Sequence, residues 1–134
     1  MFYRCIEEIL VYLRSTNDPR GNAEGVVLYG AGGRCQLFLR ELGFNDTLSF
    51  DGRNIVGLID DEPSLHFNWV HGQMVLGGLP DLPQLIPRHH ITGIVITATL
   101  TPEARAAVQA MARQHHLRLS EWCLENRNLI LSET

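Results

Sequence analysis

The turn Gly30, Ala31, Gly32 and Gly33 is the stretch whose residue types and spacing point most directly to chemistry. It follows a short apolar run and precedes an amphipathic one, which is the strand–turn–helix context of phosphate-binding turns. Main-chain N–H groups at a helix start point outward, and missing side chains permit close approach of an anion. The turn therefore predicts a site for nucleotide phosphates. Arg34 follows the turn directly. Its side chain could reach a phosphate from the first helical turn, or it could be an ordinary exposed residue.

Two carboxylates, Asp60 and Asp61, end the next predicted strand. A carboxylate in this place can accept hydrogen bonds from both ribose hydroxyls and repels a 2′-phosphate. Asp60 therefore favours NAD or a UDP-sugar over NADP. The structural alternative is that residues 60–63 form a solvated turn.

Further positions flank the predicted crevice. Cys35 occupies the third position of the Gly-x-Gly-x-x-Gly fingerprint, where a small residue lets the helix pack closely on the strand. Residues 97–100, which include Thr97, Ala98 and Thr99, lie at the end of the fourth predicted strand, where open α/β sheets hold ligands. For these three residues, contact with a ligand and a structural role ahead of the helix cap at Thr101 are equal alternatives.

Residue supply and charge exclude several classes of function. The sequence has no lysine, so all 11 residues counted as lysine or arginine are arginine. Schiff-base chemistry, a P-loop and a Tyr-x-x-x-Lys pair are therefore excluded. Three widely spaced cysteines and six histidines in sequence pairs indicate neither a disulfide framework nor a metal site. A net charge of −4 without a basic cluster argues against nucleic acid, and no apolar run predicts a membrane span or signal peptide. The cysteine pattern favours a reducing cytoplasmic compartment, with the cytoplasmic part of a membrane-associated protein as the alternative.

Short apolar runs alternate with helical patterns over most of the chain, which is typical of βαβ units. The glycine turn is followed by a helix with the apolar stripe Cys35, Phe38, Leu39 and Leu42. A second helix is expected at residues 82–86, capped by Asp81 and stopped by Pro87, and a third begins behind Thr101. Strands are expected at residues 26–29, 55–59, 74–76, 94–98 and 117–119, with an edge strand near 129–131. The pattern predicts an α/β fold of the Rossmann-like three-layer α/β/α type, with a mostly parallel sheet of about five strands.

The chain divides into two parts at residue 24. Residues 2–13 have helical apolar spacing and are followed by a polar linker, so residues 1–24 are expected to form an amphipathic helix and linker. Residues 25–134 are expected to form a Rossmann-like nucleotide-binding domain. The helix could pack on its own domain, on a second copy in a homodimer, or against an adjoining catalytic or membrane domain.

Three motifs in order resemble a known family. They are VVLYGAGG at 26–33, VGLIDDEP at 56–63 and HGQMVLGGLPDL at 71–82. Together they resemble the N-terminal Rossmann-like domain of bacterial polysaccharide-biosynthesis nucleotide-sugar epimerase/dehydratases, and similar domains occur in sugar O-acyltransferases and beside sugar-phosphate transferases. The resemblance implies a CoA-binding-like or NAD-binding fold, with phosphates at the glycine turn and ribose or base edge at Asp60. In the acyltransferases, the corresponding module holds a UDP-sugar.

These observations leave several functions open. The first is an accessory or regulatory nucleotide-binding module without catalysis of its own, since neither a Tyr-Lys epimerase domain nor a hexapeptide-repeat domain is present. The alternatives are a UDP-sugar-binding domain, or a small NAD-dependent enzyme completed by oligomerisation. Such an enzyme needs a general base near the end of the fourth strand, which only His89, His90 or an acidic residue could supply. A further alternative is an interaction domain in which Cys35 marks lost binding.

Overall fold

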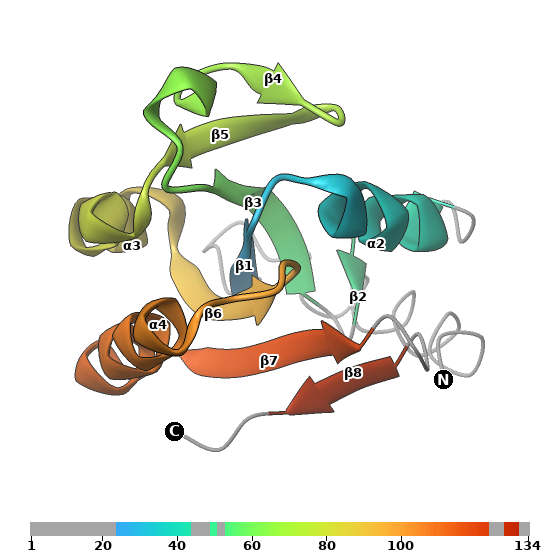
Figure 1. Ribbon diagram of the computed structural model, residues 1–134. Coiled ribbons are helices and arrows are strands. Elements are labelled where there is room, and N and C mark those ends of the chain that lie inside the picture. Colours follow the sequence, from blue (N-terminus) through green and yellow to red (C-terminus); the bar gives the residue numbers. More distant parts are fainter. Residues whose placement is uncertain (1–23, 44–48, 51–52, 124–127, 132–134) are drawn as a thin grey trace.

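The computed structural model describes residues 24–43, 49–50, 53–123 and 128–131. These residues form one mixed β-sheet with helices on both faces (Figure 1). The parallel strands are β1 (Glu24–Tyr29), β3 (Arg53–Ile59), β5 (Gln73–Gly77), β6 (Ile91–Ile96) and β7 (Arg118–Cys123). Short antiparallel strands join them: β2 (Ser49–Phe50) pairs with β3, β4 (Trp69–Val70) with β5, and β8 (Asn128–Leu131) with β7.

The order of the parallel strands places the site. Across the sheet it is β5-β3-β1-β6-β7, so the third strand of the parallel set is followed by the second, first, fourth and fifth. This is the Rossmann order, in which strand addition reverses direction between β1 and β6. Ligands bind outside the carboxyl ends of the strands at such a switch point. The residues that follow β1 and β6 therefore border the expected site.

Two hydrophobic cores lie on opposite faces of this sheet. Helix α2 (Gly33–Gly43) covers one face, and α3 (Leu82–His89) with α4 (Pro102–Gln114) covers the other (Figure 1). Phe38 of α2 is fully buried and meets Trp122 of β7 edge to face, with ring centroids 5.5 Å apart. The predicted three-layer α/β/α architecture is confirmed. Residues 128–131, for which an edge strand or packing across the sheet end was expected, form the edge strand β8, antiparallel to β7.

Local signals explain where two helices begin and what they bury. In α2, Cys35, Phe38 and Leu42 are buried and Leu39 is partly buried, as the predicted stripe requires. Helix α4 begins behind Thr101, whose hydroxyl accepts a hydrogen bond from the Ala104 amide at 3.1 Å. This N-cap satisfies one of the N–H groups that a helix start leaves unpaired.

Helix α3 differs from the prediction. It does not stop at Pro87 but continues to His89, and the His90 amide closes the helix by donating to the Ile86 carbonyl. The proline removes one N–H donor, while buried Leu82 and Leu85 hold the helix on the sheet. Asp81 precedes the helix, but its side chain accepts from the Gly78 amide at 2.9 Å and not from a helix N–H. The carboxylate therefore fixes the turn η2 (Leu79–Asp81) that leads into α3.

Strand boundaries also shift. β6 starts at Ile91 and ends at Ile96, earlier than the predicted strand at 94–98, so Ala98 and Thr99 lie in the loop that follows it. β7 extends beyond the predicted residues 117–119 to Cys123. Thr92 and Gly93 in β6, and Ser120 and Glu121 in β7, interrupt the apolar pattern, so the sequence did not predict these residues as strand. These residues are in strands because β6 pairs with β1 and β7 pairs with β6.

The connection from β3 to β5 contains no α-helix. It consists of the turn η1 (Pro63–Leu65) and a hairpin of β4 and β5. Phe67 adopts a left-handed backbone (φ 66°) and its amide donates to the Val75 carbonyl at 2.8 Å. This hairpin, which the sequence analysis did not predict, brings two histidines to the carboxyl edge of the sheet. The predicted helix at 2–13 lies outside the described residues.

Candidate functional site

The glycine turn lies at the switch point and is held there by its first residue. Gly30 has φ 112°, and its amide donates to the Ile59 carbonyl at 2.8 Å. A Cβ added to Gly30 would lie 2.4 Å from the Cβ of Ala98. The turn thus requires glycine at position 30 both for its backbone angle and for the close approach of the loop after β6.

The space above the next two residues is open. A Cβ added to Gly32 or Gly33 would meet no heavy atom within 4 Å. The Gln36 amide donates to the Gly32 carbonyl at 3.1 Å, which makes Gly32 the N-cap of α2. Helix geometry then leaves the N–H groups of Gly32, Gly33 and Arg34 without an acceptor inside the helix. An anion can approach these three amides through the open space.

Asp60 connects the end of β3 to the glycine turn. Its Oδ2 accepts from the Ala31 amide at 2.9 Å, and its Oδ1 accepts from the Glu62 amide at 2.9 Å. Each carboxylate oxygen can accept a second hydrogen bond, so the contacts leave room for ribose hydroxyls. The structure brings the two predicted parts of the site together, and the carboxylate also fixes the shape of the turn.

Two histidines that the sequence analysis did not assign to the site contact its main chain. His66 Nε2 donates to the Asp60 carbonyl at 2.7 Å, and His71 Nε2 donates to the Ala31 carbonyl at 3.0 Å. Both come from the β3–β5 connection, and His71 has a left-handed backbone (φ 52°) beside Gly72 (φ 81°). The sequence signal was the HGQ start of the third motif, but its distance from the glycine turn hid the contact.

Arg34 spans the crevice. Its Nη2 donates to the Thr99 hydroxyl at 3.0 Å, which links the start of α2 to the loop after β6. Thus Arg34 and Thr99, which the sequence placed on opposite sides of the crevice, are in contact. A guanidinium in this position can donate to a phosphate held at the turn.

Thr97 and Cys35 have structural roles beneath the turn. Thr97 is fully buried, and its hydroxyl donates to the Gly30 carbonyl at 2.8 Å. The side chain of Cys35 is fully buried in the α2 core, and burial raises the pKa of this thiol to about 11. Cys35 therefore lets α2 pack closely on the sheet and does not cover the open space above Gly32.

The two histidines considered as a general base, His89 and His90, lie far from the carboxyl edge of the sheet. His89 ends α3, and His90 precedes β6, so both lie at the amino end of that strand. The carbonyl of His90 lies 2.7 Å from a Cβ added to Gly25, at the start of β1. The expectation that His89 or His90 supplies a base beside the end of the fourth strand is wrong. Among the described residues, no group of three or more histidine, cysteine, aspartate or glutamate side chains is arranged to hold a metal.

A bidentate ion pair lies beside the crevice. Arg105 of α4 donates from Nη1 and Nη2 to Glu121 of β7 at 2.8 and 2.9 Å. These hydrogen bonds, and the charge of Arg34, lower the pKa of the Glu121 carboxyl below its usual value. The pair positions the first part of α4 against the sheet next to the loop that carries Thr99.

We expect Glu121→Gln to destabilise the protein by under ~1 kcal/mol at pH 7, because the pair is partly solvent-exposed. The folded-state pKa lies below the unfolded value, so the contribution is present above the unfolded pKa and is lost as the pH falls through the folded one. Urea denaturation from pH 7 to pH 2 measures this difference between variant and wild type. The double variant with Arg105→Gln serves as the control, and a difference that persists at pH 2 would contradict the ion-pair explanation.

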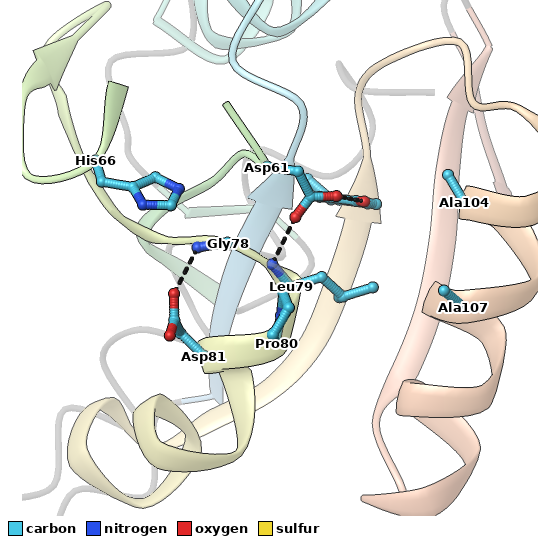
Figure 2. A pocket seen from close by; sticks show the side chains of 9 residues that line it. Asp61, His66, Gly78, Leu79, Pro80, Asp81, Ala104 and Ala107 are labelled. Carbon is cyan, nitrogen blue, oxygen red and sulfur yellow. Dashed lines mark hydrogen bonds between the residues drawn. The ribbon is translucent and has the colours of Figure 1, made fainter. Parts of the chain in front are cut away.

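A pocket of about 470 Å³ lies beside Asp61 and His66, between η2 and α4 (Figure 2). Its floor contains Tyr29, whose hydroxyl donates to Asp61 Oδ2, while Asp61 Oδ1 accepts from the Leu79 amide at 2.8 Å. Burial, and then the bond to Asp61, raises the pKa of the Tyr29 phenol. The predicted site residue Asp61 thus faces this pocket and not the glycine turn.

Solved structures that share this fold include a dehydrogenase and a protein in complex with NADH. The UDP-D-quinovosamine 4-dehydrogenase of Vibrio fischeri matches with a TM-score of 0.63 at 17% identity, over 82% of this chain and 93% of that chain. A structure of RSP in complex with β-NADH matches with a TM-score of 0.58 at 16% identity, over 76% of this chain and 47% of that one. At these identities the matches establish a Rossmann-like fold.

Neither the family models nor the curated protein sequences contain a match to this chain. Helices in the described part of the chain are too short or too polar to cross a membrane.

Proposed function

We propose that this domain binds a nucleotide, NAD or a nucleotide-sugar, across the carboxyl ends of β1 and β6. The diphosphate would contact the amides of Gly32 and Gly33 together with Arg34, and Asp60 would accept the ribose hydroxyls. Ala31, Ala98 and Thr99 would border the ligand, and Cys35 would contribute by packing. The observation that carries this proposal is the open glycine turn at the strand-order switch point, joined to Asp60 through the Ala31 amide.

The biological role we propose is that of an accessory or regulatory module in bacterial nucleotide-sugar or polysaccharide metabolism. The resemblance of the three sequence motifs supports this role, and so does the fold shared with a UDP-sugar dehydrogenase. A role without catalysis by this domain alone agrees with the fixed contacts of its candidate groups. Asp60, Asp61 and His66 each bond to the main chain around them.

Binding of a UDP-sugar is the second candidate, because one structural neighbour is an enzyme named for such a substrate. A third is a small NAD-dependent enzyme completed by a second copy. Different measurements distinguish the three candidates. Stabilisation by NAD or NADH supports the dinucleotide-binding module, and stabilisation by UDP-sugars only supports the UDP-sugar-binding domain. A change in nicotinamide absorbance during turnover supports the enzyme.

The test is a thermal-shift panel of NAD, NADH, NADP, UDP-sugars and coenzyme A on the full chain, followed by calorimetry. A ligand at a hundredfold excess over its dissociation constant should stabilise the fold by about 2.7 kcal/mol. We expect NADP to bind more weakly than NAD, because the 2′-phosphate meets Asp60. If no member of the panel shifts the melting temperature, the proposed function is wrong.

A further inference from the structure

The pocket beside Asp61 has apolar side walls and a polar end. Leu79 and Pro80 of η2 form one wall, and Ala104 and Ala107 of α4 form the opposite wall (Figure 2). Its volume of about 470 Å³ falls in the range of ~300–1,000 Å³ typical of small-molecule sites. His66, which lines the pocket, donates to the Asp60 carbonyl at 2.7 Å, so the pocket adjoins the strand end at which Asp60 would hold a ribose.

The hydrogen-bond donors around the pocket are already in use. The Gly78 amide donates to Asp81, the Leu79 amide to Asp61, and the Tyr29 hydroxyl to Asp61. His66 donates from Nε2 to the Asp60 carbonyl, and Pro80 has no N–H. A ligand that needs donors from these walls therefore finds them occupied.

Acceptors, in contrast, remain available. Both carboxylates, Asp61 and Asp81, keep unused lone pairs, since each oxygen can accept two hydrogen bonds. No lysine or arginine is among the residues that line this pocket. The lining therefore suits a flat, uncharged group that donates hydrogen bonds, and it repels phosphate.

We propose that this pocket holds the base of the nucleotide and selects a base with an exocyclic amino group, so that the ligand is an adenine dinucleotide and not a UDP-sugar. This inference rests on the proposed function, because the glycine turn must hold the diphosphate. The charges along the crevice agree with this orientation, with Arg34 beside the turn and the carboxylates Asp61 and Asp81 beside the base. Uracil offers these carboxylates a single N–H between two carbonyl oxygens, whereas an exocyclic amino group offers two N–H donors.

Matched nucleotide pairs test the base preference. ADP and IDP share ribose and diphosphate, but in IDP the 6-amino group is replaced by a carbonyl oxygen and the ring nitrogen N1 gains a hydrogen. CDP and UDP differ in the same way at C4 and N3. Hydrogen bonds to charged groups are worth ~1.5–3 kcal/mol, so calorimetry should give at least about tenfold tighter binding for ADP than for IDP. CDP should likewise bind more tightly than UDP. Equal affinities within both pairs, or a preference for UDP, would overturn the proposal.

A pocket-filling variant tests the location. Ala107 is exposed on α4 and lines the pocket, so Ala107→Trp places an indole in the space without disturbing the core. Ala106→Trp is the matched control, because Ala106 is exposed on the same helix and does not line the pocket. We expect Ala107→Trp to weaken ADP binding at least about tenfold and Ala106→Trp to leave it unchanged.

The outcomes separate this inference from the proposed function. If ADP binds equally well to both tryptophan variants but is lost when the glycine turn is altered, the turn is the phosphate site and the base lies elsewhere. If no nucleoside diphosphate and no dinucleotide binds the wild-type chain, the proposed function itself fails. Circular dichroism of both variants confirms that the fold is retained.

Discussion

Gly32→Asp should reduce nucleotide affinity by more than about 100-fold while leaving the unliganded protein at least as stable as wild type. The new carboxylate would occupy the open space over the α2 amides and repel a diphosphate, removing charge-assisted hydrogen bonds worth ~1.5–3 kcal/mol each. Aspartate is also a favoured N-cap, and Gly32 holds the N-cap position, so the helix gains an internal partner. Calorimetry with NADH measures the affinity, and thermal denaturation without ligand measures the stability.

Gln36→Asp is the matched control for this charge change. Gln36 is exposed one turn further along α2, where its side chain does not cover the helix start. Its variant should bind NADH within about tenfold of wild type, because the new carboxylate stays in solvent, where two unit charges a few ångströms apart interact by only about 1 kcal/mol. If Gly32→Asp and wild type bind NADH equally, the ligand lies elsewhere.

Gly30→Ala should destabilise the fold by about 3 kcal/mol or more. The methyl group would lie 2.4 Å from the Cβ of Ala98, and alanine is strained at φ 112°. To relieve this clash, β1 and the loop after β6 would have to move apart, and this movement would disturb the Thr97 hydrogen bonds beneath the turn. Denaturant unfolding measures the loss.

The matched control is Gly33→Ala, three residues along. An added Cβ there has no neighbour within 4 Å, and the residue begins α2, so the effect should range from none to about 1 kcal/mol of stabilisation. Equal stabilities of the two alanine variants would contradict the proposed packing of Gly30 against Ala98.

The sequence predicted the βαβ framework because its signals are local. The glycine turn, the stripe from Cys35 to Leu42 and the cap at Thr101 each depend on neighbours along the chain, and the structure retains all three. The position of Asp60 beside the turn also followed, since parallel strands bring their carboxyl ends to one edge.

The parts that could not be predicted depend on contacts between distant segments. His71 meets Ala31 only because the β4–β5 hairpin folds back over the edge of the sheet, and Asp61 enters a separate pocket because Tyr29 and Leu79 bind it. The continuation of α3 through Pro87 likewise depends on burial of Leu82 and Leu85. No periodicity in the sequence encodes these three results.

The short strands β4 and β8 have a consequence for behaviour at high concentration. Each lies antiparallel at one side of the parallel sheet, and each is only two or four residues long. A long unpaired strand invites pairing with another molecule, whereas a short outer strand offers few N–H and C=O groups for it. Removal of β8 would uncover β7 along residues 120–123, and such a truncated chain should aggregate on warming at temperatures where the intact chain stays in solution.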